Sequence, residues 1–243
     1  MSKIYDDNEF FEAYAKMERS KHGLKAAGEW HQLQPMFPDL QGKRVLDLGC
    51  GYGWHCKYAV QNGASEVLGI DSSKKMIAQA VSNNYDDRIK YAVCTIEDFT
   101  YPADFYDLVV SNLALHYIEN LDDVYQKVHR TLKMEGCFLF NIEHPTFTAG
   151  VNEDWTFDED GLCKFWAIDN YYYPGERMTN FLGKQVIKQH HTLTQILNPL
   201  IECGFQIESV EEAMPSADMM NIRGMRDEMR RPMMLLVKAK KVR

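Results

Sequence analysis

Apolar and polar positions follow two different periods along the chain. Short apolar runs predict buried strands at residues 45–48, 66–70, 89–94, 106–111 and 137–142. Amphipathic segments at 54–61, 72–83 and 121–132 separate these runs and predict helices, the last of them ended by Gly136. Because strands and helices alternate with short connections, the pattern predicts an α/β fold with a doubly wound (Rossmann-like) parallel sheet and right-handed crossovers.

The alternation does not extend to the N-terminal part of the chain. Residues 6–30 repeat apolar positions at about 3.6-residue spacing and predict a helix that Gly23 and Gly28 break or end. Two interpretations stay open for this segment. It packs on the sheet, or it forms a lid whose Tyr14 or Arg19 reaches a ligand.

Residues 143–189 interrupt the rhythm with an aromatic, turn-rich insertion that is too aromatic for a disordered linker. We expect it to fold over the ligand face of the sheet. Two interpretations stay open for the insertion. With its acidic residues Glu153, Asp154 and Asp158 it could enclose an aromatic or cationic acceptor. The default interpretation is that it serves only as a hydrophobic cover.

The C-terminal part returns to strands and helices. Residues 192–203 predict a helix that Pro199 kinks or divides, followed by strands at 205–210 and 233–239. The segment 214–231 carries no clear pattern.

A glycine-rich turn follows the first predicted strand, in the stretch RVLDLGCGYGWH at 44–55. Gly49, Gly51 and Gly53 allow positive φ and a close approach of ligand to backbone at a strand-to-helix junction. Asp47 lies near the end of an apolar strand, where a carboxylate is costly to bury without a hydrogen-bond donor or a cation. Asp71 ends the second strand 22 residues after Gly49, near the spacing at which an acid meets ribose hydroxyls. The pattern fits S-adenosylmethionine, which carries both an ammonium and a ribose, better than it fits an ordinary loop.

Composition and charge narrow the function further. The net charge of −8 argues against a nucleic-acid surface. No apolar run reaches the length of a membrane span, and the N-terminus lacks the features of a secretory signal. Six cysteines without a C-x-x-C pair are expected in a reducing cytoplasm.

Several motifs together resemble those of class I S-adenosylmethionine-dependent methyltransferases, in particular bacterial members of the methyltransferase type 11 kind. The matching pieces span about residues 10–145 and read VLDLGCGYG, VLGIDSSKKMI, TIEDF, YDLVVSNLALHYI and GCFLFNIEHP. A leader with Glu29 and Trp30, the EHP turn, the Tyr-rich insertion and a later His-x-Thr-Leu are similar to one branch of that family.

The resemblance implies a seven-stranded sheet whose last strand is antiparallel, and S-adenosylmethionine as cofactor with S-adenosylhomocysteine as product. We expect one domain over residues 1–243, with a lid (1–42), a cofactor-binding core (43–143), the insertion (144–190) and the rest of the sheet (191–243). The cofactor-binding residues that it implies, together with the two lid residues, are Tyr14, Arg19, Asp47, Gly49, Cys50, Gly51, Gly53, Asp71, Ser72, Met76, Thr95, Ile96, Glu97, Asn112 and Leu113.

Within this set the residues divide by cofactor moiety. Asp47, the glycine turn, Asn112 and Leu113 would face the methionine part, and Asp71 the ribose. Ser72, Met76, Ile96 and Glu97 would lie at the adenine, and Thr95 stands where many relatives carry Asp.

Methyl transfer from a sulfonium is an in-line displacement, so positioning the acceptor is the main task and a general base is optional. His116 and His144 are the candidate bases, and a structural role is the alternative for each; for His144 turn fixing is favoured. His190 and His191 are expected at a solvated helix start, and no metal site is expected.

The sequence predicts an enzyme that methylates a small-molecule acceptor, as a monomer or homodimer without nucleic-acid or membrane partners. A non-catalytic cofactor- or partner-binding protein and, further off, an NAD-binding oxidoreductase are the alternatives. The acceptor itself is left open.

Overall fold

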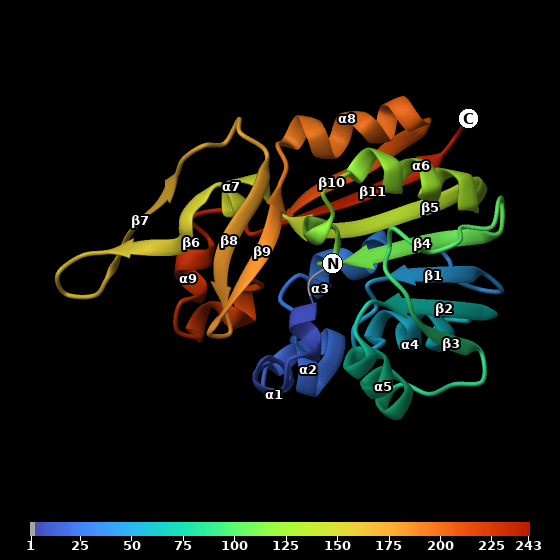
Figure 1. Cartoon of the computed structure of the whole chain (residues 1–243), viewed down its shortest axis with the longest axis horizontal. Coiled ribbons are helices and arrows are strands. Elements are labelled where there is room, and N and C mark those ends of the chain that lie inside the picture. The colour runs from blue at the N-terminus through green and yellow to red at the C-terminus, as the bar shows by residue number, and fades with distance from the viewer. Residues whose placement is uncertain (1–2) are drawn as a thin grey trace.

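A seven-stranded sheet forms the centre of the computed structural model, which describes residues 3–243 (Figure 1). Its strand order is β10-β11-β5-β4-β1-β2-β3. The strands are β1 (Arg44–Leu48), β2 (Glu66–Asp71), β3 (Ile89–Val93), β4 (Tyr106–Asn112), β5 (Leu132–Glu143), β10 (Phe205–Ala213) and β11 (Met234–Lys241). Neighbours from β3 to β5 pair in parallel, whereas β11 is antiparallel to both β5 and β10. The predicted fold class is therefore confirmed.

Side chains on the two faces of the sheet build two separate cores. Along β4 and β5, Val109 and Phe138 face one core and Leu108 and Leu139 face the other, as the two-residue period of a strand requires. The first core is covered by α6 (Leu121–Thr131) and α8 (Leu193–Cys203), and the second by α4 (Trp54–Gln61) and α5 (Lys74–Asn83). Both faces are thus buried, as expected of a doubly wound sheet.

The helix starts are fixed by side-chain caps. Ser73 accepts a hydrogen bond from the backbone N–H of Met76 at the start of α5. Thr192 and Gln195 form a reciprocal capping box at the start of α8. Helix α8 runs as one element through the buried Pro199, so a division of the helix at this proline is wrong.

Helix α6 ends at Thr131, and β5 begins directly at Leu132, five residues before the predicted strand. Gly136 therefore lies inside the strand and does not end the helix.

The N-terminal segment is a chain of short helices: the predicted helical character and the break at Gly23 are confirmed, and a further break at Met17 was not predicted. It comprises η1 (Lys3–Asp6), α1 (Asn8–Ala15), α2 (Glu18–His22), η2 (Gly23–Ala26), α3 (Trp30–Leu33) and η3 (Gln34–Met36). The extended backbone of Met17 separates α1 from α2, and Gly23 at φ +66° separates α2 from η2. A Cβ on Gly23 would lie 2.8 Å from the Trp54 ring, so the close packing of the lid on α4 needs glycine there.

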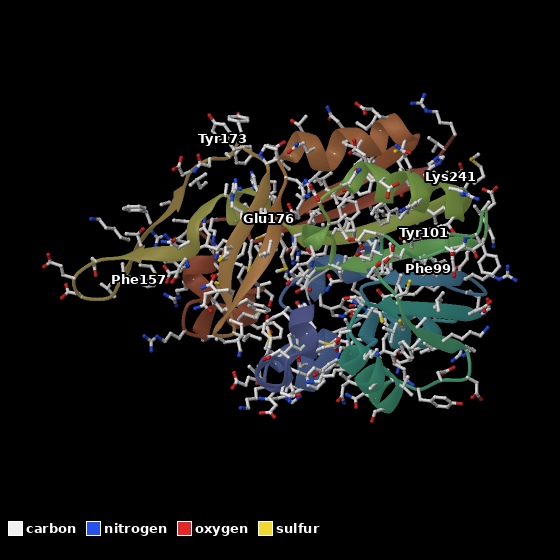
Figure 2. The ribbon with its side chains drawn as sticks, viewed as in Figure 1. Phe99, Tyr101, Phe157, Tyr173, Glu176 and Lys241 are labelled. Atoms are coloured by element: carbon white, nitrogen blue, oxygen red, sulfur yellow. The ribbon has the colours of Figure 1, made fainter. Side chains whose placement is uncertain are left out.

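The insertion consists of α7 (Pro145–Thr148) and two antiparallel hairpins that extend away from the end of β5 (Figure 1). One hairpin joins β6 (Gly150–Phe157) to β7 (Cys163–Ile168), and the other joins β8 (Gly175–Phe181) to β9 (Lys184–His190). Between β10 and β11 lie only the short η5 (Ala217–Asn221) and α9 (Met225–Glu228). Figure 2 shows Phe157 and Tyr173 on the insertion, at a distance from the sheet, and these side chains are 49% and 72% exposed.

Candidate active site

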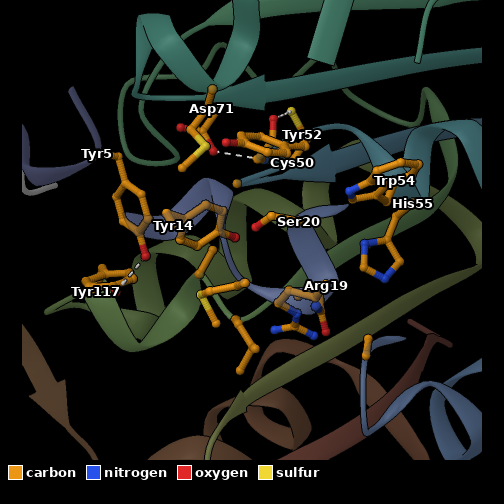
Figure 3. A pocket seen from close by; sticks show the side chains of 18 of the residues that line it. Tyr5, Tyr14, Arg19, Ser20, Cys50, Tyr52, Trp54, His55, Asp71 and Tyr117 are labelled. Atoms are coloured by element: carbon orange, nitrogen blue, oxygen red, sulfur yellow. Dashed lines mark hydrogen bonds between the residues drawn. The ribbon is translucent and has the colours of Figure 1, made fainter. Parts of the chain in front are cut away.

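A pocket opens at the carboxyl ends of the parallel strands, where ligands bind in doubly wound sheets (Figure 3). The wall is formed by the N-terminal lid, the ends of β1, β2 and β4 with the segments that follow them, Glu143 at the end of β5, Met233 before β11, and the β8–β9 hairpin. Of the predicted site residues, the structure brings together Tyr14, Arg19, Gly49, Cys50, Gly51, Asp71, Met76, Asn112, Leu113 and His116.

The glycine turn after β1 has the backbone that the sequence predicts. Gly49, Gly51 and Gly53 have φ values of +74°, +52° and +77°. A Cβ on Gly49 would overlap with the Cβ of Ala114, whereas a Cβ on Gly51 would meet no atom within 4 Å. Gly51 thus leaves backbone open toward the pocket that it lines, which is the property of a ligand cradle. Gly53 is the N-cap of α4 and lies outside the pocket wall.

Asp71 joins this turn to the start of α5. Its carboxylate accepts hydrogen bonds from the N–H of Gly51 at 3.0 Å and of Ser73 at 2.9 Å. Burial raises the pKa of Asp71, although both backbone N–H groups oppose that shift. A carboxylate that accepts one N–H on each oxygen still has free lone pairs for two hydroxyl groups. The site therefore fits a ribose.

Asp47 lies beneath the turn, not in the pocket wall where the prediction placed it. Its Oδ2 accepts a hydrogen bond from Cys56 Sγ at 3.2 Å, and its Oδ1 has no partner among the described residues. Burial raises the pKa of Asp47 to about 7.

The lid is bonded to the end of β4 through the buried carboxylate of Glu29. Arg19 lines the pocket and pairs with Glu29, whose Oε1 also accepts a hydrogen bond from Asn112 Nδ2 at 3.3 Å. Asn112 Oδ1 in turn accepts from Asn141 Nδ2 at 2.8 Å. Tyr14 and Arg19 thus occupy the lid position that was one of the two interpretations of this segment. Glu29, seen in the sequence only as a subgroup marker, is one of the residues that bond the lid to the rest of the chain.

Most of the predicted adenine contacts lie outside the pocket wall, and only Met76 lines it. Thr95 donates its hydroxyl to Asp98 at 2.8 Å and so closes a local turn. Ile96 is buried in the core, and its carbonyl accepts a hydrogen bond from Tyr101. Ser72 and Glu97 are also absent from the wall.

The two candidate bases differ in position. His116 lines the pocket, with Nε2 3.9 Å from Glu143 Oε1 and with Nδ1 unpaired among the described residues. Burial lowers the pKa of His116 well below its usual value, and Lys188 adds to this shift. His144 lies outside the wall. Its Nδ1 accepts from the N–H of Thr146 and caps α7, as the turn-fixing alternative predicts.

The adjacent histidines of the β9–α8 junction are buried, so the prediction of a solvated helix start is wrong. His190 Nδ1 lies 2.6 Å from the hydroxyl of Thr148, and His191 Nε2 lies 2.8 Å from the carbonyl oxygen of Ile118. Both are used in packing the insertion against the core.

Comparisons with known proteins agree with this geometry. The family model Methyltransf_11, described as a methyltransferase domain, matches residues 46–140. The S-adenosylmethionine-dependent methyltransferase from Mesorhizobium loti is 41% identical, covers 90% of this chain and 100% of its own, and superposes with a TM-score of 0.82. A protein from Listeria monocytogenes named for the same activity is 47% identical, covers 91% and 100%, and has a TM-score of 0.86. The chain belongs to the class I S-adenosylmethionine-dependent methyltransferases. An uncharacterized protein from Haemophilus influenzae is 32% identical over 98% of this chain and 97% of its own length.

The predicted enzyme class and cofactor are thereby confirmed. In residues 3–243 of this methyltransferase, no helix is long and apolar enough to cross a membrane, and no three His, Cys, Asp or Glu side chains are grouped as metal ligands.

Sequence reasoning missed several residues of the methyltransferase pocket, namely Tyr5, Tyr117, Glu143, Phe181 and Lys188. Tyr5 and Tyr117 share a hydroxyl–hydroxyl hydrogen bond of 2.9 Å between lid and sheet. Glu143 could have been found, because a carboxylate at the end of an apolar strand was already informative at Asp71. No sequence signal marks Lys188 as a pocket residue, because it lies on the β8–β9 hairpin, which is not paired with the main sheet.

Proposed function

We propose that this methyltransferase transfers the methyl group to a small-molecule acceptor. The observation that carries the proposal is that the N-terminal lid and the β8–β9 hairpin both contribute side chains to the pocket wall. The lid contributes Tyr5, Tyr14 and Arg19, and the β8–β9 hairpin contributes Phe181 and Lys188. An acceptor must fit between these elements and the strand ends, which suits a compact molecule better than a macromolecular surface. The net charge of −8 also disfavours nucleic acid.

The same residues suggest how the cofactor is held. Asp71 would accept hydrogen bonds from the ribose hydroxyls, Met76 would pack at the adenine, and Arg19 would donate the guanidinium N–H groups that Glu29 does not use to the carboxylate of the methionine part. Gly49 and Gly51 would offer close backbone approach, while Asn112 and Leu113 would lie beside the reactive end. The cofactor, when bound, supplies a methyl group on a positively charged sulfur.

The chain would then contribute orientation and, second, a base. Holding two reactants aligned supplies about 7–11 kcal/mol, whereas a general base adds roughly 3–5 kcal/mol. His116 is the candidate base because it lines the pocket, and its Nδ1 has no hydrogen-bond partner among the described residues.

Titration calorimetry with S-adenosylmethionine, followed by detection of S-adenosylhomocysteine released in the presence of fractionated metabolite extracts, tests the proposal. We expect release in low-molecular-mass fractions. A His116→Asn variant should keep cofactor affinity and lose about 10²–10⁴-fold in kcat/KM. Release only with protein or nucleic-acid fractions would refute a small-molecule acceptor, and unchanged turnover in His116→Asn would refute the base.

A further inference from the structure

A buried charge cluster forms the part of the pocket between β5, η4 (Leu115–Tyr117) and β9. Lys188 Nζ lies 2.6 Å from Glu143 Oε1 and 3.2 Å from Glu153 Oε2. The three side chains are 5%, 8% and 4% exposed, respectively. Glu143 and Lys188 line the pocket, whereas Glu153 lies behind them, outside the wall.

The ammonium of Lys188 is already fully surrounded. Besides the two carboxylates, the rings of Phe147 and Phe181 lie 5.4 and 5.7 Å from Nζ, within cation–π distance. Burial disfavours the ammonium, but Glu143 and Glu153 outweigh it and raise the pKa of Lys188. Lys188 is therefore neutralised and is a poor partner for an anionic acceptor.

The carboxylates, by contrast, are not fully matched. Two carboxylates share one ammonium, and the neighbouring His116 is held neutral. Glu143 Oε2 has no hydrogen-bond partner among the described residues, although the side chain is more than nine-tenths buried. A buried acceptor without a donor is costly, so this oxygen is expected to gain a partner when a ligand enters. Burial raises the pKa of Glu143, and the charge of Lys188 and its hydrogen bond to Glu143 oppose that shift.

Aromatic rings complete this part of the pocket. Tyr117 follows His116 directly, its hydroxyl bonds to that of Tyr5, and Phe181 lies on the hairpin side (Figure 3 shows Tyr5 and Tyr117 facing each other). Carboxylate and aromatic rings together are the recognition chemistry of an ammonium group.

We propose that Glu143 Oε2 binds the ammonium group of a small cationic amine, so that the acceptor carries at least one N–H-bearing, positively charged nitrogen. This inference rests on the proposed function and specifies its acceptor. It makes Glu143 the specificity-determining residue and Lys188 the residue that holds Glu143 in place.

The test uses three probes that share one phenol ring and differ in side-chain charge: tyramine (positive), tyrosol (neutral) and 4-hydroxyphenylacetate (negative). Calorimetry first measures binding of S-adenosylhomocysteine to the full chain, and then binding of each probe to the loaded protein. We expect tyramine to bind at least about tenfold more tightly than tyrosol, and the carboxylate to bind most weakly. Equal or tighter binding of 4-hydroxyphenylacetate, or no binding of any probe to the loaded protein, overturns the amine site.

Two matched variants locate the effect. Glu143→Gln and Glu153→Gln each remove one carboxylate from Lys188, but only Glu143 lines the pocket. We expect Glu143→Gln to abolish the preference for tyramine over tyrosol and Glu153→Gln to keep it, with thermal unfolding as the check of folding. Equal behaviour of the two variants refutes a direct contact. If Glu143→Gln does not fold, the wild-type probe series still decides.

The two proposals fail separately. Absence of S-adenosylhomocysteine binding by the wild type counts against the proposed function. Intact binding without a charge preference among the probes counts only against the amine site.

Discussion

Asp71→Asn separates the two roles that the structure gives this carboxylate, holding the glycine turn and meeting the ribose. Asp71 accepts the N–H groups of Gly51 at 3.0 Å and Ser73 at 2.9 Å. The asparagine amide is nearly isosteric but offers one acceptor oxygen, so one of the two N–H groups would face an NH₂ donor. We therefore expect the ligand-free protein to lose about 1–3 kcal/mol of unfolding free energy.

The effect on the cofactor is measured as a separate quantity. A ligand at 100 times its Kd stabilises a folded protein by about 2.7 kcal/mol, and a tenfold weaker one at the same concentration by about 1.4 kcal/mol. Loss of a charged hydrogen bond to the ribose should weaken affinity by about that factor. The stabilisation by S-adenosylmethionine should therefore fall by about 1.3 kcal/mol in Asp71→Asn.

Urea unfolding with and without S-adenosylmethionine, at one fixed concentration, provides both numbers. Asp86→Asn is the matched control, because Asp86 likewise accepts the backbone N–H two residues ahead, from Arg88 at 3.1 Å, but lies outside the pocket. It should leave the cofactor increment unchanged. If Asp71→Asn loses stability but keeps the full increment, Asp71 only shapes the turn and the ribose assignment is refuted.

Three further variants test the lid, the turn and a buried histidine. Glu29→Gln should lower the free energy of unfolding in urea by about 3 kcal/mol, because it removes the buried carboxylate that pairs with Arg19. Glu66→Gln, which removes the carboxylate of the exposed pair with Lys90, should cost under about 1 kcal/mol. Equal losses would contradict the role of the Arg19–Glu29 pair. Gly49→Ala should prevent folding or cost several kcal/mol, because the new Cβ would overlap with the Cβ of Ala114. Gly42→Ala is the control: Gly42 has φ +71° and open space around it, so this change should cost only about 1–2 kcal/mol of left-handed backbone strain. Similar melting temperatures of the two variants would refute the close approach at Gly49. Burial lowers the pKa of His55 to about 4, so between about pH 6.5 and pH 4 the unfolded chain binds a proton that the folded chain does not, and the free energy of unfolding falls as the pH drops. The variant His55→Gln should remove about 3 kcal/mol of that fall, measured by urea unfolding at several pH values. An unchanged pH profile in this variant would exclude His55 as its source.

Local signals predicted most of the sheet and the turn. Strand β4 was recognisable because it is buried on both faces of the sheet and therefore reads as a continuous apolar run. Asp71 was recognisable because it ends a similar run, 22 residues after Gly49 of the glycine turn. The glycine conformations followed from the same local logic, since each position needs positive φ or a close approach. These features depend on neighbours within a few residues or on the strand alternation.

Features that depend on distant partners could not be predicted in this way. Asp47 and Asp71 look alike in sequence, yet Asp71 meets two backbone N–H groups at the pocket and Asp47 meets only a thiol beneath it. The difference arises from how β1 and β2 end relative to the turn. Likewise, the aromatic richness of the insertion did not tell which rings reach the pocket: Phe181 lines it, whereas Tyr172 and Tyr173 are 84% and 72% exposed.

The charged residues of the lid and the insertion show why the site needs both segments. Arg19 reaches the cavity paired with Glu29, and Glu29 is bonded to Asn112 at the end of β4. Lys188 reaches it paired with Glu143 at the end of β5. In each case a cation from a peripheral element is neutralised by a buried carboxylate that lies at, or is bonded to, a strand end. A buried cation with its partner removed costs several kcal/mol, so the Lys188–Glu143 pair holds the hairpin against the end of β5. The Arg19–Glu29 pair lies within the lid, and the hydrogen bond from Asn112 to Glu29 joins it to β4. Glu143 lines the pocket and, unlike Glu29, keeps an oxygen without a hydrogen-bond partner among the described residues, and the proposed recognition of the acceptor by the second pair rests on this difference.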